Sequence, residues 1–155
     1  MFEFLTPEQV IEIQRDTLPN SGAPDMGRLE GALNRVKTLH FYEDCNDIFT
    51  LAAQYLIAIA KAHAFNDANK RTAFQAAAIF LLMNVDPSIP AEEEPQPYDL
   101  NQSYYLVKLT VLAAMDEANL EQVSFGLRLL SSYRNDLMVD YDDDYLPLAE
   151  ANEDE

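Results

Sequence analysis

The residues best suited to chemistry lie in one short run, 63–72, which reads His-Ala-Phe-Asn-Asp-Ala-Asn-Lys-Arg-Thr. An imidazole titrates near neutral pH, so His63 can take a proton from an incoming hydroxyl group. Asp67 supplies a carboxylate of the kind that Mg²⁺ accepts beside phosphates. Lys70 and Arg71 add two adjacent cations. A base, a metal ligand and a cationic clamp in one run are the parts that phosphate transfer needs.

The same run is predicted to be a loop that leads into a helix beginning near Asn69. Helix N-termini carry unpaired backbone N–H groups and a partial positive charge, which together bind phosphate. Lys70 and Arg71 in the first turn are unfavourable for the helix dipole unless an anion binds there. That local conflict favours a functional interpretation over an ordinary solvated basic surface. Phe65 is expected to point into the core and to fix the loop.

The elements that position this run are predicted to be helices only. Apolar residues recur at helical spacing in six segments, and the few glycines argue against a turn-rich β fold. The expected helices cover about 7–18, 27–40, 48–62, 69–84, 100–118 and 120–133. The third is apolar around much of its circumference and should be the buried central helix. Only a short hairpin within 19–26 remains compatible with the sequence as a β element.

Charge and length divide the chain into two parts. The 155 residues suit one domain, expected at 1–134, followed by an acidic tail at 135–155. The net charge is −17, and the acidic tail holds nine acids and no base. Direct binding to nucleic acid or to an anionic membrane is therefore not expected. The tail is interpreted as a flexible, solubilising end, or alternatively as a segment that folds back onto Lys70 and Arg71.

The single cysteine and the N-terminus bear on localisation. Cys45 cannot form an internal disulfide, which fits a reducing cytosol. No His/Asn signature surrounds it, so a small packed side chain is favoured over a nucleophile. No signal peptide is apparent, and no apolar run reaches the length of a membrane span. A cytoplasmic protein is expected.

The run that begins at His63 resembles the active-site motif of the Fic family, H-P-F-x-D/E-G-N-G-R. It is closer still to the Doc (death-on-curing) branch, the toxins of toxin–antitoxin modules. Further segments match Doc proteins in order and spacing, so the resemblance covers roughly residues 5–130. These segments are 27–30, 34–36, 42–43, 47–49 and 53–85. The resemblance implies a compact Fic-like helical bundle.

The resemblance also implies roles for individual residues. His63 would be the general base that activates a target hydroxyl, and Asp67 would hold Mg²⁺. Asn69, with the backbone at the helix start, would cradle a phosphate, and Arg71 would contact the nucleotide phosphates. Lys70 has no counterpart in the commonest Fic motif, which has glycine there, but it matches Doc.

Two further positions depart from the pattern of family members that transfer a nucleotide. Ala68, part of the predicted phosphate-binding set, stands where those enzymes usually have glycine, and its Cβ should crowd a phosphate. Phe74 stands where many of them place a second arginine. The resemblance to Doc instead implies a kinase that binds ATP reversed and transfers its γ-phosphate. The implied acceptor is a Thr or Ser hydroxyl of a protein such as elongation factor Tu, and its modification would arrest translation.

Two alternative functions and one protein partner are also expected from the sequence. The first alternative is a Fic-type protein adenylyltransferase, which transfers AMP. The second, motivated by the net charge, is a non-enzymatic acidic interaction protein on a Fic-like scaffold. Self-inhibited Fic proteins carry the pattern S/T-x-x-x-E-G/N, and residues 88–93 approach it without matching it. Inhibition by a separate, Phd-like antitoxin is therefore expected.

Overall fold

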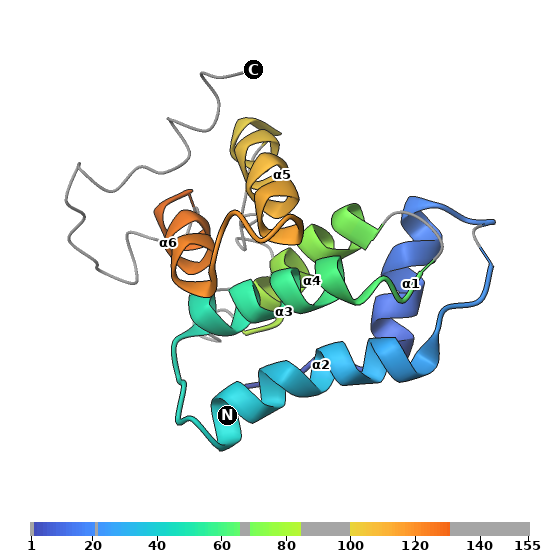
Figure 1. The fold of residues 1–155 in the computed structure, drawn as a ribbon, viewed down its shortest axis with the longest axis horizontal. Coiled ribbons are helices and arrows are strands. Elements are labelled where there is room, and N and C mark those ends of the chain that lie inside the picture. The colour runs from blue at the N-terminus through green and yellow to red at the C-terminus, as the bar shows by residue number, and fades with distance from the viewer. Residues whose placement is uncertain (1, 21, 66–68, 85–99, 131–155) are drawn as a thin grey trace.

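The structure, a computed structural model, describes residues 2–20, 22–65, 69–84 and 100–130, with side chains from residue 104 onward in the last range. Within these ranges the chain forms six helices and no strand, as predicted (Figure 1). They are α1 (Pro7–Thr17), α2 (Met26–Phe41), α3 (Ile48–Ala62), α4 (Asn69–Met83), α5 (Leu100–Ala114) and α6 (Leu120–Leu130). The prediction of an all-α fold is confirmed. Residues 85–99, before the fifth predicted helix, and the acidic tail lie outside the described residues.

Helix α3 is the centre of the bundle, as its apolar sequence predicted. It contacts α2, α4, α5 and α6, and in Figure 1 it runs between α2 on one side and α5 and α6 on the other. Its largest side chains are fully buried, and burying each contributes about 1.5–3 kcal/mol. They include Phe49, Leu51, Tyr55, Leu56 and Ile59. The end of α3 is therefore rigidly placed, and that end carries His63.

The backbone of the N-terminal segment is held against the bundle by hydrogen bonds to side chains. The Glu3 N–H donates to Asn84 Oδ1 (2.7 Å), and Asn84 Nδ2 donates back to the Glu3 carbonyl (3.0 Å). The Leu5 N–H donates to the buried Tyr55 hydroxyl (2.9 Å). Burial raises the pKa of Tyr55 to about 12, so its hydroxyl stays protonated at any physiological pH. These bonds lead the chain into α1, where Thr6 and Gln9 form a capping box.

The fifth helix is shorter than predicted, and the reason is local. We expected it to reach residue 118, but α5 ends at Ala114 and Asp116 adopts a left-handed conformation (φ 61°). Asn119 and Gln122 then exchange two hydrogen bonds of 2.9 Å each, a capping box that starts α6 at Leu120. The start at Leu120 is confirmed, whereas the cap was not recognised in the sequence.

Two other expectations can be compared with the structure. The described part of segment 19–26 contains no strand, so the hairpin is not seen there. None of the helices in the described ranges is long and apolar enough to cross a bilayer.

Candidate active site

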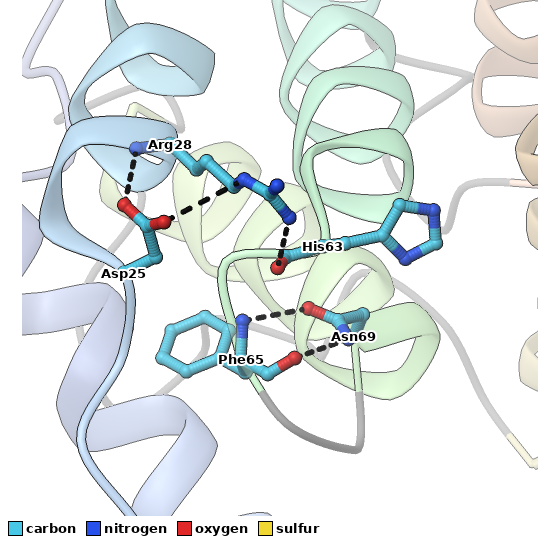
Figure 2. Close-up of polar contacts among 5 residues, drawn as sticks. All are labelled: Asp25, Arg28, His63, Phe65 and Asn69. Atoms are coloured by element: carbon cyan, nitrogen blue, oxygen red, sulfur yellow. Dashed lines mark hydrogen bonds and ion pairs between the residues drawn. The ribbon is translucent and has the colours of Figure 1, made fainter.

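His63 lies directly after α3 and turns the chain sharply. Its backbone is left-handed (φ 51°, ψ 41°). At the end of a helix this conformation is usually adopted by glycine, and it costs other residues about 1 kcal/mol. The residue is exposed, and its ring points away from α2 (Figure 2). Its carbonyl accepts a long hydrogen bond of 3.5 Å from Arg28 Nη1. The backbone is thus held from the α2 side while the imidazole faces outward.

The next two residues anchor the loop to the start of α2. Ala64 and Phe65 are both buried (4% exposed), so Phe65 points into the core as predicted. The Ala64 carbonyl accepts a hydrogen bond of 2.6 Å from the Asp25 N–H. Asp25 also caps α2, because its side chain accepts from the Arg28 N–H (3.1 Å). One residue therefore fixes both the start of α2 and the chain that follows His63.

Asn69 closes the loop from the other side. Its Oδ1 accepts from the Phe65 N–H (3.1 Å), and its Nδ2 donates to the Phe65 carbonyl (2.9 Å), as Figure 2 shows. The two ends of the stretch 66–68 are thereby held together. An amide nitrogen carries two hydrogens, and among the described residues only one of those on Asn69 has an acceptor. Its predicted contact with phosphate stays a prediction, and the structure adds that Asn69 clamps the loop.

The two cations of the motif occupy the outer face of the first turn of α4. Lys70 and Arg71 are exposed, whereas Thr72 and Ala73 are fully buried. The buried pair faces the core and fixes the rotation of the helix, which turns both cations towards solvent at its positive end. This arrangement fits a polyphosphate, because an anion there would neutralise two cations and a helix dipole together.

Other predicted residues have distinct outcomes. Asp67 and Ala68 lie outside the described residues, so the roles given to them stay predictions. In the described ranges no three His, Cys, Asp or Glu side chains group as a metal site. Mg²⁺ beside phosphates needs only one or two carboxylates, so Asp67 remains a suitable ligand. Phe74 is half-buried and packs against the core. Cys45 also packs there, and burial, followed by the nearby Glu43, raises the pKa of its thiol.

Sequence reasoning missed the contribution of α2 to this site. Asp25 and Arg28 hold the backbone of residues 63–64, yet they lie far from the motif in the chain. The available signal was the match of segment 27–30 to Doc proteins, which we used for the family and not for the site.

Comparison with known proteins establishes the family. The family model described as "Fic/DOC family" matches residues 4–81, just over half of the chain. The chain is also similar to "Protein kinase doc" of Escherichia phage P1, with 35% identity over 130 residues. That alignment covers 81% of this chain and 94% of the phage protein. The chain therefore belongs to the Fic/Doc family, and the resemblance noted in the sequence is confirmed.

Proposed function

We propose that the protein is a Doc-like toxin that transfers the γ-phosphate of ATP to a Thr or Ser hydroxyl of a protein target. The observation that carries the proposal is the exposed ring of His63, whose backbone is fixed by Arg28 and by the following loop. The phosphate-binding end of α4, with Lys70 and Arg71, begins only a few residues further on. A base and an anion site at fixed positions are what in-line phosphoryl transfer requires.

The reaction divides its tasks among these residues. His63 takes the proton from the target hydroxyl as its oxygen forms a bond to the γ-phosphorus. The bond between that phosphorus and the bridging oxygen of the β-phosphate breaks, and ADP leaves. Lys70 and Arg71 offset the charge that spreads over the phosphate oxygens. Mg²⁺, held by Asp67, would neutralise further phosphate charge when bound.

Three features support transfer of phosphate over transfer of AMP. Phe74 occupies the position of a second phosphate-binding arginine, and its side chain packs against the core, where it offers no charge. The relative from phage P1 carries the name of a protein kinase. Ala68 points the same way in the sequence alone. Protein adenylyltransferase activity is the second candidate.

The target and the partners are proposed from family resemblance. Elongation factor Tu is the proposed substrate, with arrest of translation as the consequence and the cytoplasm as the place of action. A Phd-like antitoxin is the proposed inhibitor in trans.

The test is to incubate the protein with ATP, Mg²⁺ and elongation factor Tu and to measure the mass of the intact product. The proposal predicts a gain of one phosphate, which is lost with His63→Ala. A gain of a whole AMP would replace the kinase with the adenylyltransferase. A protein that neither binds nor turns over ATP, yet binds a DNA-binding protein, would instead be the acidic interaction protein.

A further inference from the structure

A groove follows the line of contact between α2 and α3, which run in opposite directions (Figure 1). It consists of two cavities of about 410 and 390 Å³ that share the lining residues Gly31 and Arg35. Small side chains on both helices leave this space open, namely those of Ala32, Ala58 and Ala62. Between Arg28 and Leu39, which line opposite ends of the groove, α2 advances about 16 Å at the helical rise per residue.

One end of the groove, its basic end, is lined by the cations Arg28, Arg35 and Lys61. No acidic residue among those that the structure describes lines this cavity. Arg28 and Lys61 pair with Asp25 and Asp116, whose side chains are more than half exposed. Exposed pairs contribute little free energy, so a carboxylate of another chain can replace them. Arg35 is exposed and has no ion pair within the described ranges.

The rest of the groove is lined by uncharged polar side chains. Asn34, Thr38 and Gln54 line the second cavity, and the described residues provide no hydrogen-bond partner for these three side chains. A side-chain amide offers both a donor and an acceptor, which match the C=O and N–H groups of a peptide bond. Main-chain hydrogen bonds supply affinity for an extended segment, and contacts to its side chains supply specificity. The carboxylate of Glu43 lies at the end opposite to the cations.

These dimensions and charges suit an extended segment of a protein better than a small anion. An extended chain advances roughly 3.3 Å per residue, so about five residues span the groove. An acidic side chain of the segment would meet the basic end, and a basic side chain about five residues away would meet Glu43. A single phosphate would contact the basic end alone and leave the amides of Asn34 and Gln54 without a role.

We propose that this groove is a docking site for an extended segment of another protein, which places an acidic residue at the basic end and its backbone against Asn34 and Gln54. The docking does not depend on the proposed function. The groove lies on the α2 side of His63, whereas the ring of His63 points away from α2 (Figure 2). A segment bound there therefore leaves the imidazole uncovered, so that docking and catalysis use different surfaces.

The docking is tested by selecting peptides from a random seven-residue library on the full-length chain. We expect the selected peptides to share an acidic residue and a basic residue about five positions apart. Addition of one such peptide should shift the backbone amide resonances of Gly31, Thr38 and Ala58 in NMR spectra and leave those of Lys70 and Arg71 unchanged. Selected peptides without an acidic residue, or shifts centred on another surface, would overturn the proposal.

Two changes test the two kinds of contact. Arg35→Ala should weaken binding of the selected peptide about tenfold, as expected from losing a charge-assisted hydrogen bond. Methylation of the central amide nitrogens of the peptide should weaken binding by about the same factor, because Asn34 and Gln54 lose donors that they can bind. Lys37→Ala, which removes a cation of α2 that lines neither cavity, is the matched control and should leave the affinity unchanged.

Equal affinities of Arg35→Ala and Lys37→Ala would refute the role of the basic end. Unchanged binding of the methylated peptide would refute recognition of the main chain. Either result overturns the proposal.

Other occupants of the groove give distinct results in the same spectra. Inorganic phosphate that binds the basic end as tightly as the peptide would make the groove an anion site. Groove resonances that shift when the free protein is diluted would indicate a second copy of the chain. Groove resonances that shift in the free chain carrying D142N, D143N and D144N would indicate its own acidic tail. Each of these results would overturn docking of another protein.

Discussion

The two histidines of the chain lie at the ends of consecutive core helices, His40 in the last turn of α2 and His63 directly after α3, and they are held in opposite ways. His40, near the end of α2, donates from Nδ1 to the Cys45 carbonyl (2.8 Å) and packs against the rings of Phe2 and Phe4. His63, at the end of α3, is held through its backbone, while its ring is exposed. The imidazole of His40 therefore contributes to the packing of the fold. The imidazole of His63 does not, and the fold instead positions the backbone that carries it.

This difference identifies the histidine that is available for chemistry better than sequence does. The His40 ring is only partly exposed and packs among phenylalanine rings, so a substrate hydroxyl has little access to it. The exposed ring of His63 is accessible to a substrate, and the contacts of its backbone limit where the ring can lie. The contrast predicts that substitutions of His63 and its loop change activity, whereas substitution of His40 changes stability.

The largest expected effect is that of His63→Ala. Loss of the general base should lower the rate of transfer by roughly 10²–10⁴-fold. The melting temperature should change little, because the ring is exposed and the backbone contacts remain. Rates and calorimetry on the same preparations check both parts. A variant that unfolds but retains full activity per folded molecule would contradict the comparison.

The next effect in size is that of Asn69→Asp. A carboxylate can still accept from the Phe65 N–H, but it cannot donate to the Phe65 carbonyl and repels it. The loop between His63 and α4 should loosen, and the rate should fall by roughly 10–10²-fold. Gln75→Glu, a change on the exposed side of the same helix, is the matched control. Equal rates in both variants would show that the clamp does not matter for activity.

His40→Ala should show the reverse pattern. It leaves the Cys45 carbonyl without its donor and removes contacts with three phenylalanine rings, which together should cost about 2–3 kcal/mol of stability. Phosphate transfer per folded molecule should stay unchanged. Denaturant unfolding and single-turnover rates measure the two quantities. A large loss of rate at full stability would place His40 in the chemistry and break the comparison.

The smallest effect concerns Tyr55, whose hydroxyl accepts a hydrogen bond from the N-terminal segment at Leu5. Burial raises its pKa to about 12, above the usual value near 10, so the neutral hydroxyl stabilises the fold fully below pH 10. That stability is lost as the pH rises from 10 through 12, by about 1.4 kcal/mol at pH 11.

Tyr55→Phe should abolish this pH dependence and cost about 1 kcal/mol at pH 7, because the Leu5 N–H loses its acceptor. Tyr42→Phe, at a residue that is 84% exposed, is the control and should change neither value. Identical alkaline unfolding of the wild type and Tyr55→Phe would contradict the assigned role.

Most of the helices could be predicted because their signals are local. Thr6 and Gln9 cap α1, and the apolar sequence of α3 predicts a buried helix. The end of α5 was missed because a left-handed Asp116 carries no distinctive signal in one sequence. The candidate catalytic residues could also be proposed from the sequence, because a base, a carboxylate and two cations lie in one short run.

The supporting parts of the site could not be predicted, because they depend on distant elements. The hold of Asp25 on Ala64 and the convergence of Arg28, Arg35 and Lys61 both require α2 to lie beside the end of α3. The bonds between Asn69 and Phe65 depend on the path of the loop, which the types of its residues do not determine.

The central claim is that the exposed imidazole of His63 is the base for transfer of the γ-phosphate. It is tested most directly with two parallel reactions on elongation factor Tu, one with ATP labelled in the γ-phosphate and one with ATP labelled in the α-phosphate. The account predicts label on the target from the γ-labelled ATP alone, and none with His63→Ala. Label from the α-phosphate, or γ-label that persists in the His63→Ala variant, would contradict it.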